Sequence, residues 1–140
     1  MSPRDCQKRL AGKSGLISGG ARGIGAAIAE VLAASGAAVM VTDVVEDLGK
    51  AVVERIRESG GQAGFHRLDV TDEAQWATAV SATIKSLGGL DFVVNNAGVE
   101  LIDRVVDTDF EKWCRLQDVN SDGVFLGTKH AIRAMKPGGA

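Results

Sequence analysis

Short apolar runs alternate with stretches of helical periodicity along the chain, and this alternation limits the fold more than any other feature. The apolar runs cover residues 15–18, 38–42, 63–70 and 90–94. After the first run, apolar side chains recur at the spacing of one helix face, at Ile24, Ile28, Val31 and Leu32. Strands that alternate with helices require crossover connections, so we expect a parallel sheet with helices on both faces.

Composition excludes several classes of protein. The 140 residues fit one domain, and 16 basic against 18 acidic residues leave a net charge of -2 without the basic block that a nucleic-acid binder needs. No apolar stretch is long enough for a signal peptide or a membrane span. We therefore expect a cytoplasmic protein whose partners are small molecules, with no role for nucleic acid or membrane.

A glycine cluster follows the first apolar run, where the first strand of a parallel sheet would turn into its helix. Gly19, Gly23 and Gly25 stand there in the spacing G-x-x-x-G-x-G, which differs from the common G-x-G-x-x-G pattern. Glycine lets the backbone turn sharply and lets a pyrophosphate approach the helix amides. A tight turn without any ligand is the alternative interpretation of this cluster.

Asp43 favours a dinucleotide over a simple turn. It lies 24 residues after Gly19 at the end of the second apolar run, where an acid can accept hydrogen bonds from the adenosine ribose. Its charge would repel a 2'-phosphate, which favours NAD over NADP. Arg22, within the loop, argues the other way, because a cation there can pair with a 2'-phosphate; we expect Asp43 to dominate.

The third helix is expected to begin after the run that ends at Val70. Thr71 is the predicted N-cap, because Asp72 and Glu73 then occupy the first turn, where the helix dipole favours acidic side chains. A fourth helix is expected to open after Thr108. It would carry a further set of apolar residues on one face, namely Phe110, Trp113 and Val124.

With these residues in view, the chain resembles the short-chain dehydrogenase/reductase family from about Leu10 to its last residue. Three motifs carry the resemblance in the family's order: a T-G-x-x-x-G-I-G loop with serine in place of threonine (Ser18, Gly19, Gly23, Ile24, Gly25), the pair that flanks adenine (Asp69, Val70), and N-N-A-G (Asn95, Asn96, Ala97, Gly98). The resemblance implies a Rossmann-like doubly wound α/β fold, truncated after about four strands and four helices, with residues 1–140 as the amino-terminal part of a dinucleotide-binding domain.

The resemblance also implies an incomplete catalytic set. Asn120 matches the first member of the family's Asn, Ser, Tyr, Lys set, whose main chain holds a water in a proton relay. Its neighbours Ser121, Asp122 and Gly123 are typical of a turn, but the family pattern favours an interrupted helix. The sequence contains no tyrosine, so the general acid/base of the family is missing and the 140 residues alone are predicted to be inactive.

The sequence is compatible with two functions, and less well with a third. The first is the front part of an NAD-dependent alcohol dehydrogenase or ketone reductase, and the second is a non-catalytic nucleotide-binding or interaction module. A flavodoxin-like phosphate site would leave Asp43 and the N-N-A-G segment without a role. The family's fourth strand pairs with a fifth and its fourth helix packs on a dimer partner, so we expect an open sheet edge and a homo-oligomer.

Overall fold

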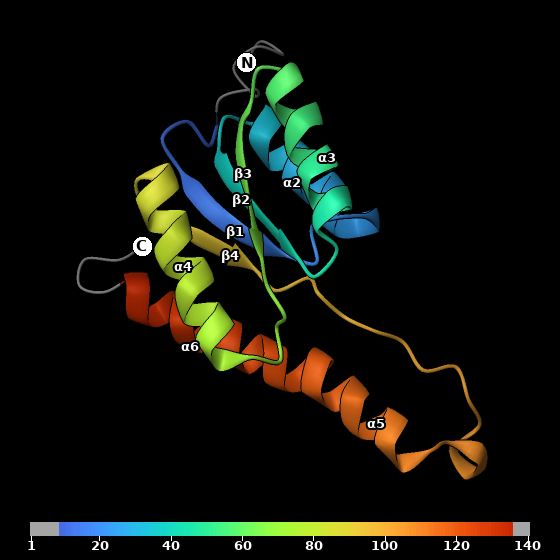
Figure 1. The fold of residues 1–140 in the computed structure, drawn as a ribbon. Coiled ribbons are helices and arrows are strands. Elements are labelled where there is room, and N and C mark those ends of the chain that lie inside the picture. The colour runs from blue at the N-terminus through green and yellow to red at the C-terminus, as the bar shows by residue number, and fades with distance from the viewer. Residues whose placement is uncertain (1–8, 136–140) are drawn as a thin grey trace.

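The computed structural model describes residues 9–135, which form a parallel sheet flanked by helices (Figure 1). The strands are β1 (Ser14–Ser18), β2 (Ala38–Asp43), β3 (Gln62–Arg67) and β4 (Phe92–Val94). The helices are α2 (Gly23–Ala34), α3 (Glu46–Glu58), α4 (Glu73–Leu87), α5 (Phe110–Gln117) and α6 (Gly123–Met135). A short 3₁₀ turn, Val105–Asp107, precedes α5.

The strands lie in the order β3-β2-β1-β4, and every pair is parallel. β1 occupies the interior of the sheet, with Gly15 to Ile17 opposite Phe92 to Val94 on one side and Ser14 to Ser18 opposite Ala38 to Thr42 on the other. All residues of β1 are buried, as expected for a strand covered on both faces. This architecture confirms the predicted Rossmann-like α/β fold.

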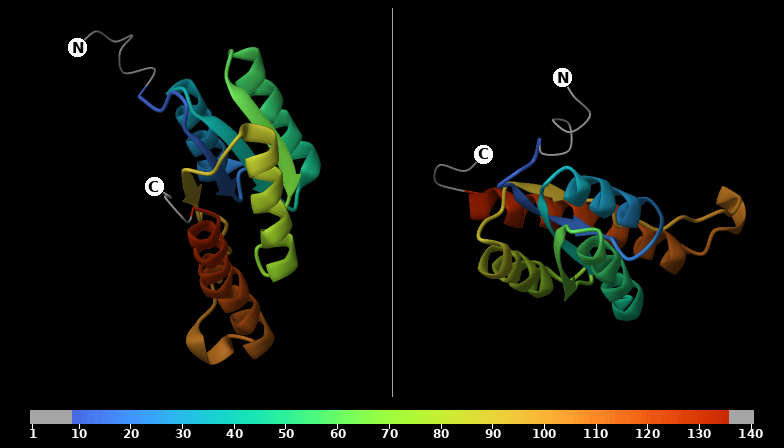
Figure 2. Two further views of the ribbon diagram at one scale, coloured as in Figure 1. Left: turned by 90° about the vertical axis from the view of Figure 1, so that its left-hand side faces the viewer. Right: turned by 90° about the horizontal axis from the view of Figure 1, so that it is seen from above.

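The two faces of the sheet bury separate apolar cores, which Figures 1 and 2 show as helix layers on opposite sides. Helices α2 and α3 cover one face, where Ile17, Val39 and Val41 meet Val52 and Ile56. Helices α4 and α6 cover the other. There the buried Trp76 packs with a second set of residues, namely Leu16, Met40, Leu68, Val70, Ala79 and Val119.

Helix α2 packs on the sheet mainly through small residues, which corrects half of the expected apolar stripe. Ala26, Ala29 and Ala33 are buried, whereas Ile24 and Val31 are 76% and 64% exposed. The other two residues of the stripe, Ile28 and Leu32, are partly buried and pack against the core as predicted. The last turn ends as predicted, because Gly36 follows the cap residue Ser35 with a φ of 98°.

The start of α4 differs by one residue from the prediction. Asp72, not Thr71, is the N-cap, and its side chain accepts a hydrogen bond from the Gln75 amide at 3.1 Å. Thr71 instead donates both its amide and its hydroxyl to Asp69. Aspartate and threonine are both good N-caps; Thr71 is bonded to Asp69, two residues before it, and Asp72 takes the cap position.

The last helix is interrupted, as the family pattern predicted. A π-helical turn, Asp118–Asp122, joins α5 to α6 without a loop, and it contains Asn120. The buried side of this helix again consists of small residues spaced by four, namely Val119, Gly123, Gly127 and Ala131. The expected face of Phe110, Trp113 and Val124 is exposed instead, and α5 projects beyond the sheet (Figure 1).

Two further features bear on the sequence predictions. β4 is an outer strand in the order of the described sheet, so self-association along this edge stays a prediction. Among residues 9–135, none of the helices has the length and apolar character needed to cross a bilayer.

Candidate functional site

The predicted cofactor residues converge on one cleft beyond the carboxyl ends of the strands. The cleft encloses about 320 Å³. All the predicted cofactor residues except Gly23 line it, namely Gly19, Arg22, Ile24, Gly25, Asp43, Asp69, Val70, Asn96, Ala97 and Gly98. Ligands of open α/β sheets bind at this edge, where the strand order reverses; here the reversal lies between β1, which pairs with β2, and β4.

The glycine loop between β1 and α2 is held open by its lack of side chains. Gly19 has a φ of 63° and Gly23 a φ of 55°, values that other residues adopt at a cost. A Cβ at Gly25 would overlap the Gly19 carbonyl oxygen and the Asn96 side chain. The loop therefore forms a cradle at the start of α2, where backbone amides favour an anion.

Asp43, at the end of β2, lines the cleft and is fixed there by backbone amides. Its Oδ2 accepts from the Ala21 amide at 3.1 Å, and its Oδ1 accepts from the Val45 amide at 3.0 Å. The first bond ties the end of β2 to the glycine loop. A carboxylate oriented in this way still has free lone pairs to accept hydrogen bonds from hydroxyl groups in the cleft.

Asp69 also lines the cleft, two residues after the end of β3. Its Oδ1 accepts from the Thr71 hydroxyl at 2.7 Å and from the Thr71 amide at 3.0 Å. These bonds, first the hydroxyl and then the amide, hold the pKa of the Asp69 carboxyl below its usual range, and the charges of Arg115 and Arg67 act in the same direction. The carboxyl group is thus an ionised acceptor at neutral pH.

The N-N-A-G segment after β4 is bonded to the end of β1. The Asn96 side-chain amide donates to the carbonyls of Ser18 and Gly19 at 3.1 and 3.0 Å. The Ser18 hydroxyl in turn accepts from the amides of Asn96 and Ala97, both at 3.1 Å. The segment therefore fixes the glycine loop from the side opposite to Asp43.

The match to known proteins agrees with this geometry. A family model described as enoyl-(acyl carrier protein) reductase matches residues 19–140. A crystal structure of a short-chain type dehydrogenase/reductase from Mycobacterium marinum superposes with a TM-score of 0.89 at 38% identity, over 96% of this chain and 54% of that chain. The chain belongs to the short-chain dehydrogenase/reductase family.

Two curated relatives of this short-chain dehydrogenase/reductase have named activities. Trans-4-hydroxycyclohexanecarboxylate dehydrogenase of Sinomonas cyclohexanicum is 44% identical over 94% of this chain and 53% of its own length. Cyclopentanol dehydrogenase of Comamonas testosteroni is 41% identical over 91% of this chain and 51% of its own length. The chain spans about half the length of the curated relatives it matches.

Asn120 lies beside the cleft of this family member rather than on its lining. Its side-chain amide donates to the Val99 carbonyl and its Oδ1 accepts from the Val99 amide, both at 2.8 Å. The side chain is therefore occupied in holding the segment after Gly98.

Three residues that line or support this site were not predicted from the sequence. Ser18, 1% exposed, joins β1 to the segment after β4 through its hydroxyl. Arg115 lines the cleft from α5, and Gln75 bonds to the Asp69 backbone from α4. Ser18 has a local signal, as a hydroxyl residue in the glycine motif, and Gln75 has one, three residues after the N-cap Asp72; Arg115 reaches the cleft by helix packing.

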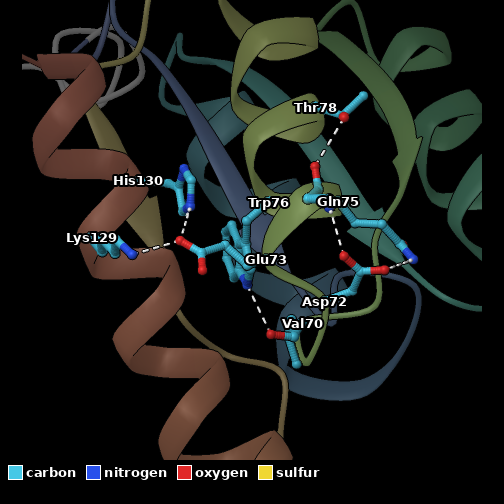
Figure 3. Close-up of polar contacts among 9 residues, drawn as sticks. Val70, Asp72, Glu73, Gln75, Trp76, Thr78, Lys129 and His130 are labelled. Atoms are coloured by element: carbon cyan, nitrogen blue, oxygen red, sulfur yellow. Dashed lines mark hydrogen bonds and ion pairs between the residues drawn. The ribbon is translucent and has the colours of Figure 1, made fainter.

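A cluster of charged residues joins α4 to α6 (Figure 3). Glu73 Oε1 lies 2.6 Å from Lys129 Nζ and 3.2 Å from His130 Nε2. The hydrogen bonds from Lys129 and then from His130 hold the pKa of Glu73 below its usual range. These side chains lie outside the cleft lining, and they position the helix that contains Asn120.

Proposed function

We propose that this chain is the NAD-binding part of an oxidoreductase that interconverts a secondary alcohol and a ketone. The single observation that carries the proposal is the convergence of four segments, distant in sequence, on one cleft. The glycine loop packs against Gly25 too closely for a Cβ, and its residues line the cleft at the start of α2, where backbone amides fit a pyrophosphate. The fixed carboxylates of Asp43 and Asp69 fit hydroxyl and amino donors of an adenosine.

The residues of the chain would divide the work as follows. The amides after Gly19 would hold the pyrophosphate, Asp43 would accept from the ribose hydroxyls, and Ala97 and Gly98 would border the nicotinamide. When NAD is bound, it supplies a hydride acceptor for the carbinol carbon. The main chain of Asn120 would orient a water for the departing hydroxyl proton, so we regard Asn120 as a positioning residue.

The substrate class comes from the relatives. Both named relatives are dehydrogenases of alcohols on saturated rings, so cyclopentanol and cyclohexanol are the substrates to test first. The sequence has no tyrosine, and we therefore expect no turnover of these alcohols by the 140 residues alone. Oxidation at an ordinary rate would overturn this part of the proposal and identify a different general base.

The preference for NAD rests on Asp43. A fixed carboxylate at the ribose position repels a 2'-phosphate, although Arg22 also lines the cleft. We expect the chain to bind NADH more tightly than NADPH in calorimetry, and Asp43→Asn to shift the ratio toward NADPH by about tenfold or more. Glu58→Gln at the far end of α3 is the control of equal charge change. Equal or tighter NADPH binding by the unsubstituted chain would refute the argument.

A non-catalytic nucleotide-binding module is the second candidate, favoured by the side chain of Asn120, which is bonded to Val99 and does not line the cleft. It shares the binding prediction and differs in having no substrate. We also propose a homo-oligomer, because α5 and α6 expose Phe110, Trp113, Phe125 and Ile132. A cytoplasmic location stays a prediction from the sequence.

A further inference from the structure

The Gln75 side chain connects the first turn of α4 to the wall of the cleft. Its Oε1 accepts from the Asp69 amide at 2.8 Å. Its Nε2 donates to Asp72 Oδ2 at 3.1 Å, as Figure 3 shows. Arg67 also donates to Oε1, at 3.3 Å. Both ends of the side-chain amide are thus engaged, and the reversed orientation would point its NH₂ group at a backbone amide and its oxygen at a carboxylate.

The bond from the Asp69 amide to Gln75 Oε1 replaces a hydrogen bond that the sheet does not provide. β3 ends at Arg67, so the Asp69 amide lies beyond the strand ladder. Gln75 accepts its hydrogen, while Thr71 occupies Oδ1 of the same residue. The main chain and the side chain of Asp69 are therefore both fixed, at a point where the residue lines the cleft between Leu68 and Val70.

We propose that Gln75 is a positioning residue for adenine recognition, a role that rests on the proposed NAD site. By fixing Asp69, it holds an ionised carboxylate where it accepts a hydrogen bond from the exocyclic amino group of the purine. A hypoxanthine base has a carbonyl oxygen at this position, and two acceptors facing each other repel. Gln75 then contributes to the choice of base more than to overall affinity.

The test compares NADH with its hypoxanthine analogue, in which oxygen replaces the 6-amino group, by fluorescence titration of the 140-residue chain. The unsubstituted chain is expected to bind NADH more tightly. Gln75→Met keeps the length of the side chain and removes its hydrogen bonds. We expect Gln75→Met to reduce the preference for NADH over the analogue by about threefold to tenfold. This is the effect of losing the one hydrogen bond between Asp69 and the adenine amino group, worth about 0.5–1.5 kcal/mol. The affinity for the analogue should change little.

Three further variants make the result specific. Asp69→Asn is expected to reduce the ratio at least as far as Gln75→Met. Gln62→Met, the same replacement at an exposed site at the start of β3, is expected to leave the ratio unchanged. Thr71→Val removes the hydroxyl that holds the Asp69 carboxylate and tests the same claim if Gln75→Met fails to fold.

The outcomes separate this inference from the proposed function. An unchanged ratio in Gln75→Met overturns the role of Gln75, and so does an equal loss of both ligands, because a merely structural residue would weaken both. If the unsubstituted chain binds neither ligand at millimolar concentration, the NAD site itself is wrong and the inference fails with it.

Discussion

Replacing Ser18 by alanine tests the link that holds the cleft together. Ser18 is 1% exposed, and its hydroxyl accepts from two partly buried amides, those of Asn96 and Ala97, at 3.1 Å. It donates more weakly to the Val94 carbonyl at 3.4 Å. The Asn96 amide also donates to the Val94 carbonyl at 3.0 Å, so Ser18→Ala would leave the Ala97 amide without an acceptor, at a cost of about 1 kcal/mol or more.

The expected loss of unfolding free energy is therefore about 1–2 kcal/mol. With a urea m-value of about 2 kcal/mol/M, typical of a small domain, the midpoint of unfolding should fall by about 0.5–1 M. Urea titration followed by circular dichroism measures this shift. NADH affinity should fall in parallel, because the Ser18 hydroxyl holds the main chain of Asn96, whose side-chain amide in turn donates to the Gly19 carbonyl.

Thr83→Val is the matched control. Thr83 is fully buried, but its hydroxyl only donates to the Ala79 carbonyl at 2.8 Å, within α4. Removing it leaves no donor without a partner, so we expect a change below about 1 kcal/mol. The reasoning is refuted if Ser18→Ala loses less than about 0.5 kcal/mol, or if Thr83→Val loses as much.

Two more predictions concern the loop and the sheet. Gly25→Ala places a Cβ against the Gly19 carbonyl and should reduce the free energy of unfolding by about 3 kcal/mol through overpacking. At Gly23, with a φ of 55°, the Cβ of Gly23→Ala meets nothing within 4 Å, so the backbone conformation alone should cost about 1 kcal/mol. Thermal unfolding that ranks the two variants the other way would contradict the prediction. The Ser14 amide donates to Asp91 at 2.8 Å, which lowers the pKa of that carboxyl. A carboxyl whose pKa is lowered in the folded state stabilises the fold above its unfolded pKa of about 4, and this stabilisation is lost as pH falls through its folded pKa. The free energy of unfolding measured in urea should therefore decline below about pH 4. Asp91→Asn should make that decline smaller.

The sequence predicted the order of strands and helices because β1, β2 and β4 contain short apolar runs bounded by glycine or a polar residue. β3 includes His66 and Arg67 and ends at Arg67 rather than at Val70. The run that ends at Asp43 and the interruption at Asn120 both match the structure. Motifs that are local in sequence, such as the glycine loop, could be placed on the correct edge of the sheet because parallel strands bring their carboxyl ends together.

The side of each helix that packs against the sheet was less predictable. Hydrophobic periodicity gives weight to large side chains, so it selected Val31 and Phe110, which are exposed, and passed over Ala29 and Gly127, which are buried. The position of Arg115 on the cleft depends on how α5 lies relative to the sheet. No pattern within the individual helices carries that information.

The packing of α2 through small residues has a practical consequence for redesign. At Ala29 one added methylene group would have to displace the sheet, at a cost of about 1–3 kcal/mol. At Ile24 or Val31, 76% and 64% exposed, exchange for a polar residue should change stability by less than about 0.5 kcal/mol. Solubility can therefore be improved on α2 at its largest apolar residues, although Ile24 also lines the cleft, which leaves Val31 as the safer choice.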